Sequence, residues 1–121
     1  MKRICWPDGK DFAFTIIDDT DMATVSNVFP VYDYLLAKGI RTTKTVWTQS
    51  PRDYFSGSSL QDEDYCKFVL PLHKSGVEIA YHGAGSGDFT GAETADGLEK
   101  IRQIIPKTLL IFTGAASVFL R

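Results

Sequence analysis

The chain has 121 residues, of which 44% are hydrophobic and 23% are charged, which fits one compact domain and leaves little room for a second. Thirteen basic residues against fifteen acidic residues give a formal net charge of -2, and no basic run could track a phosphate backbone, so nucleic acid is not an expected partner. The longest uncharged stretch, residues 108–120, is shorter than the roughly 20 apolar residues that cross a bilayer, so no membrane span is expected. The basic start of the chain is not followed by the apolar stretch of a signal peptide, which favours a cytoplasmic location.

The first expected element is a buried strand over residues 12–17, a run of β-favouring apolar side chains that ends at Asp18 and Asp19. Residues 24–38 follow as an amphipathic helix, because apolar side chains recur there at three- and four-residue spacings and a glycine then ends the pattern. Pro30 lies inside this helix and either begins its regular part or kinks it, because proline lacks a backbone donor.

The middle of the chain predicts a second strand, a long loop and a second helix. Residues 40–47 carry threonines and valine in a β-type pattern, and residues 48–59 are rich in serine, glycine and proline, as exposed loops are. Residues 60–75 predict a helix with acidic side chains in its first turn, where the helix dipole favours them. Pro71 lies late in this helix and allows a kink or an early end near Leu70.

The last part of the chain continues the same alternation. Residues 77–81 predict a third strand, residues 82–91 a glycine-rich loop, residues 92–105 a third helix and residues 109–112 a fourth strand. This order predicts an α/β fold with parallel strands joined by right-handed crossovers.

Three polar residues stand where predicted strands end: Asp18 and Asp19 after the first strand, and His82 after the third. Parallel strands bring their carboxyl ends to one edge of a sheet, where open α/β folds bind ligands. Adjacent residues of an extended chain point to opposite sides, so we expect one carboxylate to bind a cation and the other to accept a proton from an attacking water. In the alternative interpretation, one carboxylate caps the next helix and the other is solvated.

The order of these motifs resembles that of the polysaccharide deacetylases, the NodB-homology family of carbohydrate esterases. In that family, a strand ending in Asp-Asp is followed by a helix, a Lys-Gly-Ile turn and a threonine-containing strand, which Asp18, Asp19 and residues 38–43 match here. The glycine and the Glu-Ile step that precede the family's first histidine are matched within residues 76–82. The resemblance covers residues 12–105, and the ordered combination is more specific than any single motif.

The resemblance implies a partial or distorted (β/α) barrel in which Asp18 is the general base and Asp19 and His82 are metal ligands. It also implies a divalent metal, commonly zinc, and removal of N-acetyl groups from an amino sugar or a related amide. The family's second histidine falls four residues after the first, at a position that is Ser86 here. Because a catalytic zinc usually has three protein ligands, Asp88 is the candidate for the third.

The family's catalytic barrel is longer than this chain and its later motifs are not identifiable here, so we interpret residues 1–121 as a single, incomplete deacetylase-like domain. Two other interpretations stay open: an inactive relative that binds carbohydrate or metal, and a phosphotransfer-type α/β domain suggested by the acidic cluster of Asp18, Asp19 and Asp21. The expected partners are a carbohydrate or small amide substrate and a second copy of the chain, bound through the apolar residues 108–120.

Overall fold

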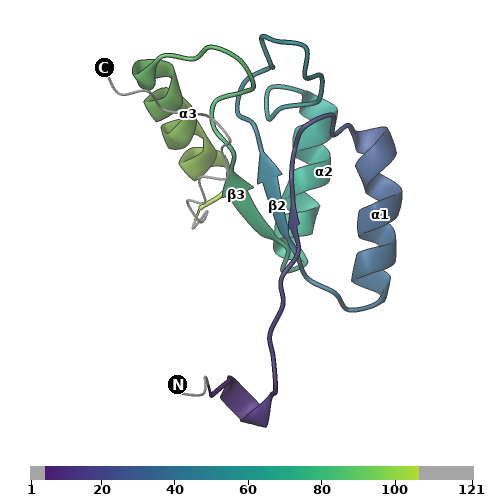
Figure 1. Ribbon diagram of the computed structural model, residues 1–121. Coiled ribbons are helices and arrows are strands. Elements are labelled where there is room, and N and C mark those ends of the chain that lie inside the picture. The colour runs from purple at the N-terminus through teal and green to yellow at the C-terminus, as the bar shows by residue number, and fades with distance from the viewer. Residues whose placement is uncertain (1–4, 107–121) are drawn as a thin grey trace.

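The computed structural model describes residues 5–106, in which three strands alternate with three α-helices after a short 3-10 helix, Pro7–Gly9 (Figure 1). The predicted fourth strand at residues 109–112, and the apolar residues 108–120 expected to bind a second copy, lie outside the described residues. The elements are β1 (Ile17–Asp18), α1 (Val25–Ala37), β2 (Thr43–Val46), α2 (Glu63–Lys74), β3 (Glu78–Tyr81) and α3 (Gly91–Ile104).

The three strands form one open sheet in the order β1-β2-β3, and both neighbouring pairs are parallel. In the register of the first pair, Ile17 lies opposite Thr43 and Asp18 lies opposite Lys44. Parallel neighbours require a crossover connection, which α1 and α2 provide, so the predicted α/β class with parallel strands is confirmed. Because the strands are parallel, the residues that follow β1 and β3 reach the same edge of the sheet.

Both helices that contain a proline continue through it. Helix α1 begins at Val25, before Pro30, and α2 runs past Pro71 to Lys74, so the early end near Leu70 does not occur. A proline removes one helical hydrogen bond, whereas the packing of an apolar face holds the rest of the helix.

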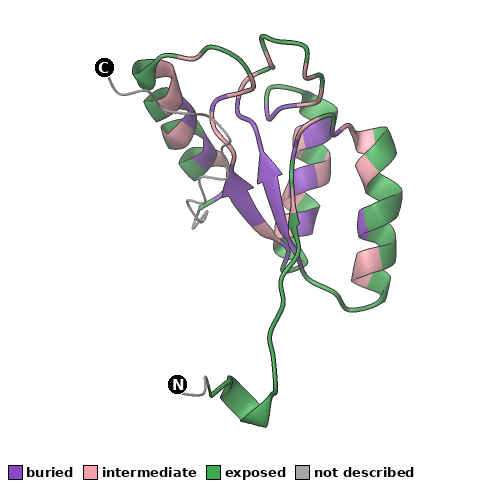
Figure 2. Ribbon diagram, viewed as in Figure 1, coloured by how far each residue is buried: buried purple, intermediate pink, exposed green. Residues whose placement is uncertain are grey.

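The hydrophobic core lies between the sheet and the inward faces of the helices. Figure 2 shows β2 and β3 buried over nearly their whole length, whereas α1 is buried at few positions. Burial of apolar surface is the main favourable term in folding, so this layer holds β2 and β3 in place beneath the site. The core side chains are Tyr32, Val46, Leu60, Tyr65, Val69, Leu72, Val77, Ile79, Tyr81, Ile101 and Ile105.

The prediction of a buried strand over residues 12–17 is wrong in both extent and burial. Only Ile17 and Asp18 form β1, and the side chains of Phe12 and Phe14 lie 72% and 77% exposed. The purple segment in Figure 1 runs away from the body of the molecule before it enters the sheet. An apolar run is buried only where another element packs on it, and none of the described elements covers this one.

Helix α3 approaches the sheet closely at Gly97. A β-carbon at this position would lie 2.5 Å from Thr48 Oγ1 and 2.6 Å from the Tyr81 hydroxyl oxygen, well inside van der Waals contact. That hydroxyl also donates a hydrogen bond to the Thr94 carbonyl oxygen at 2.8 Å, so the ring cannot move without losing a contact. We expect Gly97→Ala to lower the free energy of unfolding by about 1–3 kcal/mol, as measured by urea denaturation.

Gly91→Ala is the matched control, because Gly91 lies in the same helix and nothing lies within 4 Å of a β-carbon placed there. Its free energy of unfolding is expected to stay unchanged or to rise slightly, since alanine restricts the unfolded chain more than glycine does. Equal stability of the Gly97 and Gly91 variants would contradict the close packing of α3 on the sheet.

Candidate metal centre

The candidate site lies at the carboxyl edge of the sheet. Asp18 is the last residue of β1 and His82 directly follows β3. The His82 N–H donates a hydrogen bond to the Val46 carbonyl oxygen at 3.0 Å, which extends the pairing of β3 with β2 into the site. Asp19 and Asp21 lie in the connection between β1 and α1. The topology therefore brings together residues that are far apart in the sequence.

A buried threonine orients the two aspartates that flank it. Thr20 is fully buried, and its hydroxyl lies 3.5 Å from the hydroxyl of Tyr65 in the core. The Ala23 N–H donates to the Thr20 carbonyl oxygen at 2.9 Å and closes the turn. Thr20 lies in the core, whereas the side chains of Asp19 and Asp21 are 59% and 35% exposed, so the turn leaves both carboxylates outside the core.

The side chains of Asp19, Asp21 and His82 converge. His82 Nε2 lies 3.0 Å from Asp19 Oδ1 and 3.9 Å from Asp21 Oδ1, and one ligand atom from each of the three lies within 4.8 Å of the others. One imidazole nitrogen and two carboxylate oxygens are donors that divalent metals take up in proteins. The group can therefore hold a metal ion. We call these three residues the metal group.

The electrostatics of the metal group favour a cation. The pKa of the Asp21 carboxyl is raised, first by its partial burial and then by the neighbouring Asp19 carboxylate, while His82 acts in the opposite direction. Two carboxylates held this close oppose each other's charge, and a bound cation removes that repulsion.

Asp18 lies in a different environment from Asp19. Its Oδ2 accepts a hydrogen bond from the Tyr32 hydroxyl at 2.8 Å and forms an ion pair with Lys44 Nζ at 3.1 Å. The Lys44 side chain is fully buried, and burial lowers the pKa of its ammonium group while Asp18 opposes that shift. Lys44 Nζ also donates to the Asp19 carbonyl oxygen at 3.1 Å. One buried lysine therefore fixes both members of the Asp-Asp pair.

The predicted third ligand lies outside the metal group. The Asp88 carbonyl oxygen accepts a hydrogen bond from Arg52 Nη1 at 3.1 Å, and among the described residues its side chain is not one of those that converge. Ser86, at the position of the family's second histidine, donates its hydroxyl to Asp53 Oδ2 at 2.7 Å. The glycine-rich loop is thus held by contacts with the loop that follows β2.

The structure brings together Asp19 and His82, as the sequence predicted, and adds two residues to the site. The sequence suggested Asp21 only as part of an acidic cluster, because Asp21 lies in the turn after β1, where the alternation of a strand no longer applies. Lys44 was expected only as part of a strand, and a lysine among threonines gives no sign of burial.

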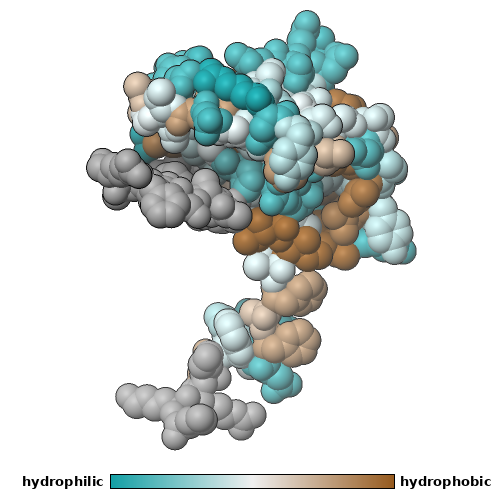
Figure 3. All heavy atoms as spheres, turned by 45° about the horizontal axis from the view of Figure 1, so that its top comes forward, coloured by the Kyte–Doolittle hydropathy of each residue, from teal (hydrophilic) through white to brown (hydrophobic). Residues whose placement is uncertain are grey.

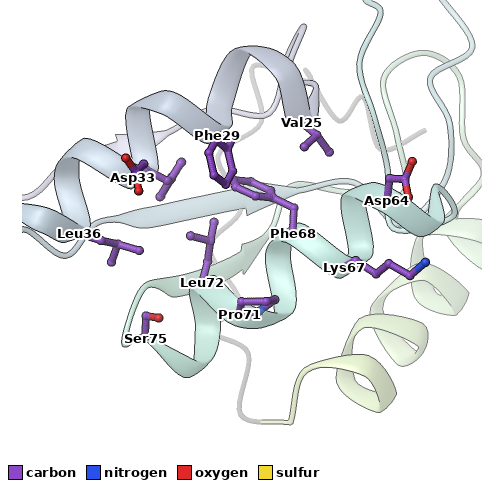
Figure 4. A pocket seen from close by; sticks show the side chains of 11 residues that line it. Val25, Phe29, Asp33, Leu36, Asp64, Lys67, Phe68, Pro71, Leu72 and Ser75 are labelled. Atoms are coloured by element: carbon purple, nitrogen blue, oxygen red, sulfur yellow. The ribbon is translucent and has the colours of Figure 1, made fainter.

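A hollow of about 550 Å³ lies between α1 and α2 and is separate from the metal group (Figure 4). Phe29 and Phe68 lie close together in it, with ring centroids 6.3 Å apart, and Leu36 and Leu72 line it further along the helices. The described residues that line this hollow include none of the metal group. The candidate metal ligands therefore lie at the sheet edge and not in this hollow.

No family model, curated protein or solved structure matches this chain. A functional assignment therefore rests on the arrangement of its own residues. Within residues 5–106, no helix combines the length and the apolar character that crossing a membrane requires.

Proposed function

We propose that this chain is a metal-dependent hydrolase of the polysaccharide deacetylase type, which removes N-acetyl groups from an amino sugar or a related amide. The observation that carries the proposal is the metal group of Asp19, Asp21 and His82, together with a further carboxylate, Asp18, which Lys44 and Tyr32 hold at the end of β1. A cation site and a nearby carboxylate outside it are the two parts that amide hydrolysis by an activated water needs.

Asp19, Asp21 and His82 would hold the divalent ion, which we propose to be zinc. Three protein ligands with nitrogen and oxygen donors are typical of catalytic zinc sites, which keep one position for water. In this assignment Asp21, and not Asp88, is the third ligand. When bound, the ion lowers the pKa of a water molecule and polarises a carbonyl oxygen.

Asp18 is assigned as the general base. Its contacts with Tyr32 and Lys44 both use Oδ2, so Oδ1 is the atom that would accept the proton of the attacking water. The water oxygen then forms a bond to the acetamide carbonyl carbon, the carbon–nitrogen bond breaks, and the proton passes to the leaving amine. The products are acetate and the free amino sugar.

The order of the strands supports a partial (β/α) barrel over a phosphotransfer fold of the receiver type. Successive strands of a (β/α) barrel are neighbours, as β1, β2 and β3 are here. Receiver-type domains instead place their first strand between the second and the third. We therefore propose the barrel architecture together with the hydrolase function.

The test measures acetate release from N-acetylglucosamine oligomers by metal-stripped protein, before and after zinc is restored. We expect release only with zinc. Asp21→Ala is expected to weaken zinc binding by about 100-fold, because loss of even an outer contact to a ligand costs 10–100-fold. Asp88→Ala is the matched control and is expected to bind zinc as the wild type does.

Two outcomes would contradict this proposal in different ways. Stoichiometric zinc binding without acetate release on any acetylated oligomer would favour the inactive relative, an interpretation that Ser86 at the position of the family's second histidine supports. If the Asp21→Ala variant binds zinc as tightly as the wild type does, Asp21 is not a ligand and the assigned metal group is wrong.

A further inference from the structure

The projecting segment of residues 12–17 exposes apolar side chains that the metal centre does not use. Phe12, Phe14, Ile16 and Ile17 are all exposed, and no residue of the segment is charged. Figure 3 shows hydrophobic residues along this projection and on the adjoining face of the body. An uncharged apolar strand at the edge of a sheet is a template for pairing with another chain.

The backbone of the same segment is open to pairing. β1 is an edge strand that pairs with β2 through Ile17 and Asp18, and the Ile16 carbonyl oxygen accepts one more hydrogen bond from the Thr43 N–H at 3.0 Å. Within the described part of the chain, no strand pairs with the other edge of β1. Backbone donors and acceptors there lack the strand partner that a wider sheet would supply.

We propose that two copies of this chain associate by pairing these segments as antiparallel strands, which joins their sheets into one. A two-fold axis makes the two strands antiparallel, because each copy presents the same edge. If Phe14 lies opposite Phe14 on the axis, then Phe12 lies opposite Ile16. Aromatic pairs, and an aromatic residue paired with a β-branched one, stabilise cross-strand neighbours.

A hollow between β1 and α1 gives the second copy a place to insert a side chain. It measures about 250 Å³. Ile16, Ile17, Val31 and Leu35 give it apolar walls, and Asp18, Asp19, Tyr32 and Thr42 also line it. In the proposed register, Phe12 of the second copy lies next to Ile16 and therefore at this hollow. Each copy carries both an exposed ring and a hollow to receive one, which favours a second copy over an unrelated partner.

Sedimentation equilibrium of the full chain over a wide range of concentrations tests this surface. We expect the wild type to form a dimer and Phe14→Lys to raise its dissociation constant by more than about 100-fold, because two lysines would face each other on the axis. Phe14 is largely exposed, so the substitution should leave the fold intact. Tyr54→Lys is the matched control, since Tyr54 is an exposed aromatic residue in a loop and its variant should dimerise normally.

A disulfide tests the register directly. Cys5 and Cys66 are free and are replaced by serine, and Phe14→Cys is then introduced. Residues opposite each other in antiparallel strands have Cα atoms about 4.5–5.5 Å apart, within the range of a disulfide, so mild oxidation should yield a linked dimer. Tyr54→Cys in the same background should stay unlinked.

Two results would overturn the proposal. A wild type that is monomeric at every concentration would show that this edge does not bind a second copy, and a dimer that survives Phe14→Lys would place the contact elsewhere. Neither result depends on zinc or on acetate release, so this inference and the proposed function fail or stand separately.

Discussion

Asp18→Asn is expected to lower the rate of acetate release by the zinc-loaded protein by about 10²–10⁴-fold, the usual contribution of a general base. Asparagine keeps the shape of the side chain and still offers an oxygen to Tyr32 and Lys44, but its amide cannot take a proton from water. The measurement compares kcat with zinc stoichiometry in the same preparation. Zinc should stay bound, because Asp18 is not a member of the metal group.

Asp33→Asn is the matched control for this change. Asp33 is an exposed carboxylate on α1 that lines the separate hollow between α1 and α2, so its variant should keep the full rate. An Asp18→Asn protein that hydrolyses at the wild-type rate would show that another group accepts the proton. If the Asp18→Asn protein loses both its zinc and its activity, Asp18 is instead a metal ligand.

The pairing of Asp19 with His82 could be predicted because it depends on topology alone. Apolar runs separated by amphipathic helices imply parallel strands, and parallel strands deliver the residues that follow them to one edge. The same reasoning could not find Asp21 as a neighbour of His82. That placement depends on Thr20 turning into the core against Tyr65, a contact between distant parts of the chain.

The burial of Lys44 depends on the strand register, which periodicity does not specify. Asp18 lies directly opposite Lys44 in the β1–β2 pair, and a slip of one residue would send the lysine to the other face of the sheet. The exposure of Phe12 and Phe14 escaped prediction for a related reason. An apolar pattern indicates that a segment needs cover, but it does not identify the element that supplies it.

Lys44→Met is expected to lower the free energy of unfolding by about 3 kcal/mol, as measured by urea denaturation of metal-stripped protein. Removing one partner of a buried ion pair leaves the other charge uncompensated, which costs 3–5 kcal/mol, and we take the lower end because the Asp18 side chain is 35% exposed. Methionine fills a similar volume, so the decrease in the free energy of unfolding comes from the lost charge more than from a cavity.

Lys67→Met is the control for the loss of a lysine. Its ammonium group forms an ion pair with Glu63 at 2.6 Å on the surface of α2, and exposed pairs of this kind contribute little to stability. We expect its free energy of unfolding to change by less than about 0.5 kcal/mol. A cost as large as that of Lys44→Met would mean that the assay reports a general effect of lost positive charge.

The double variant Lys44→Met with Asp18→Asn separates the ion pair from the packing of the lysine stem. It removes both charges, so it should be more stable than Lys44→Met alone, and the double-mutant cycle gives the coupling between the two side chains. A coupling near zero would contradict the view that Lys44 holds Asp18 by charge.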